Sequence, residues 1–158
     1  MNRENYKQAW AFATRFCSQA EHCQSEISLK IKRFELSGSE MEKLFEALKA
    51  EKYLDNNRYA KAFVNDKMRF AKWGKLKIQY MLQEKGICKK DIEKALDGID
   101  IDAYNSILLE LLQQKKNTLK ANSDFELNAK ITRFALSRGF EYNEIKSQMK
   151  QLNALCDD

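Results

Sequence analysis

The sequence of 158 residues contains no proline and only five glycines. Average usage would place about eight prolines in a chain of this length. Proline and glycine form the turns that separate strands and shape long loops. A chain that is nearly without them, with 44% hydrophobic and 32% charged residues, favours helices joined by short connections. We therefore predict an all-α protein and exclude doubly wound sheets, barrels and sandwiches.

An internal repeat organises these helices. Ile27, Ile78 and Ile131 lie 51 and 53 residues apart, and the residue four positions further on is apolar in each copy. Units of about 50 residues are marginally stable alone, so neighbours must share buried surface. We predict an elongated, curved stack of three three-helix repeat modules. The modules are predicted to span residues 1–53, 54–100 and 101–158.

Each module is expected to contain three helices. The first helix is expected at 4–19, 55–71 and 102–117, the second at 22–35, 75–85 and 124–138, and the third at 39–51, 89–97 and 142–153. Ser39 followed by Glu42 predicts a capping box at the third helix of the first module, and residues 122–124 offer a cap in the third. Gly86 and Gly139 lie where a helix end favours a left-handed residue.

The residue types limit the chemistry that this chain can perform. His22 is the only histidine, and no partner pattern for nucleophilic catalysis or zinc binding surrounds it. No glycine-rich phosphate-binding motif is present. We therefore predict that the protein is not an enzyme and uses no metal or cofactor.

The location of the protein also follows as an expectation. Residues 1–7 have no apolar signal core, and the longest apolar-leaning run, 103–112, falls short of the roughly 20 residues that a bilayer requires. We expect a cytoplasmic protein that does not contact a membrane. Its four cysteines are then expected to be reduced thiols. They are Cys17, Cys23, Cys88 and Cys156.

The positive charge is concentrated in the middle of the chain. Residues 52–101 contain twelve lysines and arginines against seven acidic residues, a surplus of five, which equals the formal net charge of +5 for the whole chain. Residues 1–51 and 102–158 are each neutral. Such a concentration favours a partner with negative charge, either nucleic acid or an acidic protein surface.

A helical wheel separates the charges of the helix expected at 55–71. Its apolar arc includes Phe63 and Phe70, and a basic stripe lies opposite. Lys67 falls within the apolar arc. We interpret it as a side chain that either extends to solvent or pairs with an acid such as Asp55.

The next helix places cations where the helix dipole disfavours them. Lys75 and Lys77 occupy its first turn, so backbone N–H groups and lysines are expected to form an anion site. Trp73 precedes this helix, and Leu76 and Tyr80 are expected to point away from the core. The alternative is that Trp73 and Tyr80 pack against a neighbouring module.

We therefore predict one partner- or nucleic-acid-binding surface on the middle module. A solvated face without a partner is the alternative interpretation of the same stripe. The predicted site residues are Arg58, Lys61, Arg69, Lys72, Trp73, Lys75, Lys77 and Tyr80.

The middle module resembles the RecX family, the regulators of the RecA recombinase. The resemblance rests on the run Tyr53-Leu54-Asp55-Asn56-Asn57-Arg58-Tyr59-Ala60-Lys61-Ala62-Phe63-Val64, followed by Asp66-Lys67, Trp73-Gly74, Ile78, Leu82 and Lys85-Gly86-Ile87. The sequence departs from the family pattern at Asn56, where a second aspartate is usual. Asparagine also caps helices, so the expected helix start is unaffected.

The resemblance implies three-helix repeats, no enzymatic activity, and a protein that binds RecA filaments on single-stranded DNA by lying in the filament groove. It also implies that the protein modulates recombinase activity in DNA recombination and repair; we expect inhibition, with stabilisation of the filament as the alternative. Two other interpretations stay open: a DNA-binding helical-repeat module that acts without RecA, and a scaffold that binds no nucleic acid. We expect a monomer.

Overall fold

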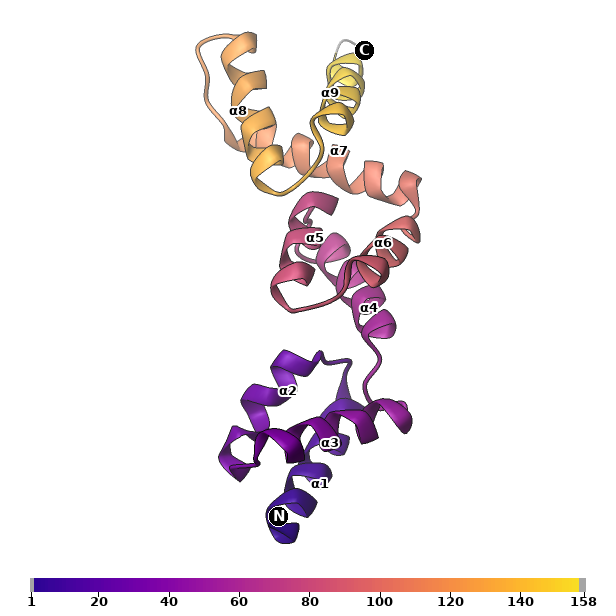
Figure 1. Ribbon diagram of the computed structural model, residues 1–158. Coiled ribbons are helices and arrows are strands. Elements are labelled where there is room, and N and C mark those ends of the chain that lie inside the picture. The colour runs from indigo at the N-terminus through magenta and orange to yellow at the C-terminus, as the bar shows by residue number, and fades with distance from the viewer. Residues whose placement is uncertain (1, 157–158) are drawn as a thin grey trace.

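The structure, a computed structural model, describes residues 2–156, and that part of the chain contains helices and no strand (Figure 1). This confirms the all-α repeat fold. Module 1 comprises α1 (Arg3–Gln19), α2 (Gln24–Ile31), a short 3-10 turn η1 (Lys32–Phe34) and α3 (Gly38–Ala50). Module 2 comprises α4 (Asn56–Arg69), α5 (Lys75–Glu84) and α6 (Lys89–Asp97), and module 3 comprises α7 (Ile101–Thr118), α8 (Asp124–Ser137) and α9 (Tyr142–Cys156).

The three groups of helices follow one another along an elongated molecule, with the two ends of the chain far apart (Figure 1). The residue boundaries predicted for the modules stay predictions. No helix in residues 2–156 has the length and apolar character needed to cross a membrane.

The repeat register places equivalent residues in the cores. Ile27, Ile78 and Ile131 are all fully buried, and so is Leu82, which follows Ile78 by one helical turn. Such spacing puts successive apolar residues on one helix face. Ile92, on the third helix of the middle module, is buried as well, while Phe63 packs against the core with part of its surface exposed.

Modules 2 and 3 share one hydrophobic core, whereas module 1 has a core of its own. The shared core contains Ile78 from module 2 and Leu108 and Ile131 from module 3. The core of module 1 is built around Ile27 and Leu44. Cys23, at the start of α2, is the residue of module 1 that is buried in the shared core.

An asparagine or aspartate caps the first helix of each module. Asp55 accepts hydrogen bonds from the backbone nitrogens of Asn57 and Arg58, and Asn2 and Asp100 cap α1 and α7 in the same way. These caps satisfy backbone N–H groups that have no partner within the helix. A predicted cap is confirmed at α8, where Ser123 accepts from the nitrogen of Glu126.

The second helix of each module ends on a left-handed residue. Gly86 and Gly139 have φ angles of 80° and 92°, as the sequence predicts. The equivalent position in module 1 is Glu35, with φ of 53°, so a non-glycine residue adopts the same turn there. The turn is therefore a property of the repeat rather than of glycine alone.

The predicted capping box at Ser39 and Glu42 is wrong by two residues. The box forms between Ser37 and Glu40: Ser37 Oγ accepts from the Glu40 nitrogen at 3.2 Å, and Glu40 accepts from the Ser37 nitrogen at 3.3 Å. Both serines precede a glutamate by three residues, so the local pattern alone does not distinguish them.

Modules 2 and 3 meet where two glycines face each other. The backbone nitrogens of Gly74 and Leu76 donate to the carbonyls of Arg138 and Gly139, at 2.7 and 3.0 Å. A Cβ added to Gly74 would overlap the backbone of Gly139, and one added to Gly139 would overlap Lys77. Both glycines are therefore required by the close approach of the two backbones.

Candidate functional site

The basic stripe of α4 does not form one uninterrupted anion-facing surface. Arg58 Nε donates to Glu21 of module 1 at 2.8 Å, and its Nη2 donates to the carbonyl of Lys52. Arg58 is therefore held in the joint between modules 1 and 2. Lys61 and Arg69 line a separate cavity between α4 and the end of α6.

The remaining predicted residues surround the start of α5. Lys72 lies in the preceding loop, with φ of 56°. Trp73 is half-buried, and the Nζ atom of Lys77 lies 4.6 Å from the centre of its ring. The Nζ atom of Lys75 lies 5.1 Å from the ring of Tyr104 in module 3. Tyr80 is 60% exposed, which confirms that it points away from the core.

The expectation that the start of α5 offers free backbone N–H groups to an anion is wrong. The backbone nitrogen of Lys75 donates to the hydroxyl of Tyr104 at 3.0 Å, and the amides of Gly74 and Leu76 donate to carbonyls of module 3. Tyr104 in turn donates to Glu141. Module 3 therefore caps this helix and occupies the amides of Gly74, Lys75 and Leu76.

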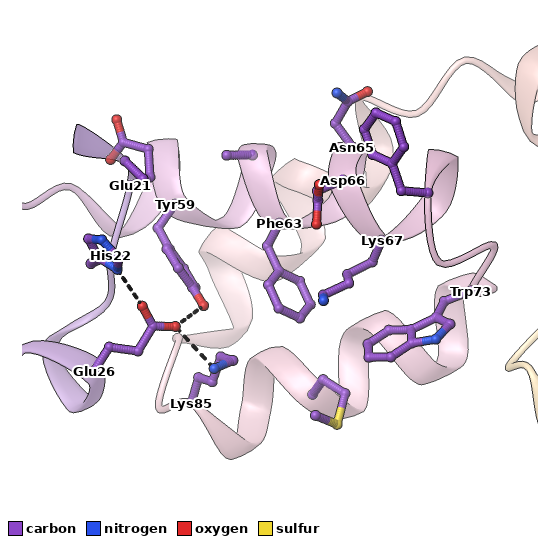
Figure 2. A pocket seen from close by; sticks show the side chains of 14 residues that line it. Glu21, His22, Glu26, Tyr59, Phe63, Asn65, Asp66, Lys67, Trp73 and Lys85 are labelled. Carbon is purple, nitrogen blue, oxygen red and sulfur yellow. Dashed lines mark hydrogen bonds and ion pairs between the residues drawn. The ribbon is translucent and has the colours of Figure 1, made fainter. Parts of the chain in front are cut away.

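A lysine–aromatic cleft of about 660 Å³ lies between α4, α5 and the start of α2 (Figure 2). We define it by Phe63, Lys67, Phe70, Trp73, Met81 and Lys85. The Nζ atom of Lys67 lies 5.5 Å from the Phe63 ring centre and 5.1 Å from that of Trp73. Ring faces attract cations at such distances. Lys61 and Arg69 do not line this cleft, so the predicted residues are divided between two hollows.

Two expectations for α4 are corrected at this cleft. Lys67 does not pair with Asp55, because twelve residues of helix separate them by about 18 Å and Asp55 caps the helix start. Phe70, placed on the apolar arc, is 80% exposed at the cleft. The helix ends at Arg69, so the wheel does not extend to Phe70.

Glu26 joins module 1 to module 2 at the other end of the cleft (Figure 2). Its carboxylate accepts hydrogen bonds from Tyr59 Oη at 2.7 Å and Lys85 Nζ at 3.1 Å, and it pairs with His22 Nδ1 at 2.8 Å. Burial by itself would raise the pKa of Glu26. The hydrogen bonds from His22, Tyr59 and Lys85 and the charge of Lys85 outweigh burial and lower the pKa from 4.5 to about 2.

Glu26→Gln is expected to lower the free energy of unfolding by about 1–3 kcal/mol at pH 7, because it removes the charge from these hydrogen bonds. The folded pKa lies below the unfolded one. The stabilisation is therefore complete above pH 4.5 and is lost as the pH falls towards 2. Urea unfolding of both proteins from pH 7 to 3 checks this. Glu46→Gln, on an exposed residue of α3, is the control. A difference that stays constant down to pH 3 would contradict the assignment.

Sequence reasoning missed Glu26, Tyr59 and Lys85 as a joint. A signal was present: each module has an asparagine or aspartate followed four residues later by tyrosine, at Tyr6, Tyr59 and Tyr104. Tyr59 and Tyr104 are both buried, and each hydroxyl bonds to the second helix of the preceding module. Burial raises the pKa of both hydroxyls above the ordinary tyrosine value, so they stay protonated well into the alkaline range.

The cysteines and acids offer no arrangement of metal ligands in the described part of the chain, where no three His, Cys, Asp or Glu side chains gather. Cys17, Cys23 and Cys88 are free thiols. The side chain of Cys156 lies outside the described residues. What the geometry offers is a set of lysines beside aromatic rings, which suits binding to an anionic partner.

The fold and the site together define a helical-repeat protein whose middle module carries the surplus of basic residues. Residues 55–96 match the second three-helix domain of RecX, and residues 102–149 match the third. The chain is 31% identical over 150 residues to the regulatory protein RecX of Finegoldia magna, covering 92% of this chain and 72% of that protein. The chain belongs to the RecX family.

Other relatives carry the same name. The regulatory protein RecX of Clostridium beijerinckii is 29% identical over 148 residues, which cover 92% of this chain and 68% of the relative. That of Clostridium botulinum strain Alaska E43 is 40% identical over 111 residues, or 69% of this chain and 51% of the relative. The matched stretch thus spans between half and about two thirds of these two relatives.

Solved structures agree with the fold. The crystal structure of RecX from Lactobacillus salivarius superposes with a TM-score of 0.84 at 19% identity, covering 96% of this chain and 98% of that one. A crystal structure of regulatory protein RecX superposes with a TM-score of 0.83 at 18% identity, covering 92% of this chain and 73% of that one. At these identities the likeness concerns the fold.

Proposed function

We propose that this protein binds RecA filaments on single-stranded DNA and limits the activity of the recombinase. Membership of a family of regulatory proteins supports a regulatory role. The observation that carries the proposal is the concentration of the net charge of +5 in module 2, the middle of an elongated molecule. An extended basic protein is suited to follow an anionic filament. The protein acts in the cytoplasm as a monomer, without a cofactor or catalysis of its own.

The surface that engages the filament includes Lys61, Arg69 and the lysines at the start of α5. Lys61 and Arg69 are exposed, and within residues 2–156 the hydrogen bond of the Arg69 side chain is to Asn65, one turn earlier on the same helix. Lys72, Lys75 and Lys77 continue the positive charge towards module 3. Trp73 and Tyr80 add ring surface, and Arg58 contributes by holding modules 1 and 2 together.

Reversing the charge of this surface is expected to weaken filament binding. Lys61→Glu combined with Arg69→Glu should reduce the affinity for RecA filaments about ten-fold or more at low salt, with unfolding free energy changed by less than about 1 kcal/mol. The start of α5 is tested by a triple variant, Lys72→Gln with Lys75→Gln and Lys77→Gln. Fluorescence anisotropy of filaments on labelled DNA, at two salt concentrations, measures the affinity of both variants. The loss should shrink at high salt because ions screen the attraction.

The matched control is Lys43→Glu with Lys49→Glu, two exposed lysines of α3 in module 1. It changes the net charge as much as the α4 variant but leaves module 2 intact, and we expect less than a two-fold effect. Equal losses in both variants would mean that net charge alone matters. Equal binding of the parent to naked DNA and to filaments, with the same salt dependence, would favour a DNA-binding module that acts without RecA.

A further inference from the structure

Lys67 occupies an unusual environment within the lysine–aromatic cleft. Its side chain is half-buried, with the ammonium between the rings of Phe63 and Trp73 (Figure 2). Among the described residues it takes part in no ion pair. Removing an ammonium from water costs free energy that ring faces offset only in part, so a carboxylate or phosphate beside it would be favoured.

The cleft also offers apolar surface that the fold does not use. Phe70 is 80% exposed at its edge, and Phe63, Trp73 and Met81 line its interior. Large exposed aromatic side chains beside a hollow are typical of sites where a partner inserts an apolar side chain. The volume of about 660 Å³ is ample for one aromatic or leucine side chain with its neighbours.

We propose that the lysine–aromatic cleft binds a short segment of a partner protein in which an apolar side chain stands next to a carboxylate. The apolar side chain packs against Phe63, Phe70 and Trp73, and the carboxylate pairs with Lys67. That this segment belongs to the protein of the filament, and not to its DNA, rests on the proposed function. The binding chemistry of the cleft does not depend on the proposed function.

The charges of the cleft favour a protein segment over a DNA strand. Glu21, Glu26 and Asp66 line the same cleft as Lys67. Glu21 already forms an ion pair with Arg58, and Glu26 forms one with Lys85, so the charges of Arg58 and Lys85 are neutralised. A strand with a phosphate at every nucleotide would bring phosphates close to carboxylates, whereas a peptide can place one carboxylate at Lys67 alone.

The two tryptophans of the chain allow a direct test by NMR. Trp73 lines the cleft, and Trp10 packs against Tyr53 in module 1, so their indole N–H resonances serve as reporter and internal reference. The protein is titrated with acetyl-Asp-Phe-amide, which carries a single carboxylate beside its aromatic side chain. The comparison probes are acetyl-Asn-Phe-amide and an oligothymidylate of eight nucleotides. We expect the acidic peptide to shift Trp73 in a saturable way, without shifting Trp10, and to bind more tightly than either comparison probe.

Lys67→Met keeps the aliphatic stem and removes the charge, and it is expected to weaken binding of the acidic peptide about five-fold or more. Lys67→Arg should bind within about three-fold of the parent because it restores the charge. Lys90→Met is the control in the same module, since Lys90 is exposed on α6 and lines neither hollow, and it should leave the affinity within about two-fold. In each ligand-free variant, a Trp73 indole resonance near the parent position verifies that module 2 is folded, and an unchanged Trp10 resonance verifies module 1.

With the parent protein, any one of three results would overturn the proposal: no saturable shift of Trp73 with the acidic peptide, equal affinity for the neutral peptide, or tighter binding of the oligothymidylate at this reporter. Equal affinity of Lys67→Met and the parent would do the same. Because RecA is absent from this experiment, its failure leaves the filament assay of the proposed function to be judged separately.

Discussion

Gly139→Ala is expected to lower the free energy of unfolding of the unit formed by modules 2 and 3 by about 3–5 kcal/mol. Two effects add. The residue has φ of 92°, a conformation that disfavours any side chain. In addition, a Cβ at this position would overlap the Cβ of Lys77 and lie 2.5 Å from its backbone nitrogen, so the backbones must separate.

Gly86→Ala separates these two effects. Gly86 ends α5 as Gly139 ends α8, with φ of 80°, but no atom lies within 4 Å of an added Cβ. We therefore expect a loss of only about 1–2 kcal/mol, from the backbone alone. Urea unfolding monitored at Trp73 measures both variants, with Gly38→Ala as a reference in open space. Equal losses for Gly139→Ala and Gly86→Ala would show that the glycine contact does not constrain the joint.

Leu82→Ala is expected to cost about 2–5 kcal/mol, as the loss of a buried leucine side chain does. Leu82 is fully buried in the core that modules 2 and 3 share, next to Ile78 in the repeat register. The cavity should therefore destabilise both modules together. Module 1 has its own core, against which Trp10 packs, and should retain more of its stability.

The two tryptophans distinguish these regions in thermal or urea unfolding. Trp73 should report an earlier transition in Leu82→Ala, and Trp10 a smaller change. Leu76→Ala on the same helix is the control: Leu76 is 53% exposed, and we expect a loss of less than about 0.5 kcal/mol. A loss below about 1 kcal/mol for Leu82→Ala, or equal shifts at both tryptophans, would contradict the division into a shared core and a separate one.

Much of this fold was predictable because its determinants are local or periodic. Three determinants act within a helix or between neighbouring turns: the absence of proline, the register of Ile27, Ile78 and Ile131, and the left-handed positions Gly86 and Gly139. Errors arose where a short pattern occurs twice, as with Ser37 and Ser39. Charge composition likewise identified module 2 as the basic one.

The tertiary structure alone decided what the basic residues face. The Arg58 side chain bonds to Glu21, which is 37 residues away. The amide of Lys75 donates to Tyr104, 29 residues away, and Lys85 donates to Glu26, 59 residues away. A helical wheel records the face of a residue within its own helix but not the rotation between modules. Contacts across the joints depend on that rotation, which between modules 2 and 3 is set by the shared core and the two facing glycines. For this reason the sequence by itself determined the helices, their repeat and the charge of module 2, whereas the capped start of α5, the Glu26 joint and the lysine–aromatic cleft required the packed structure.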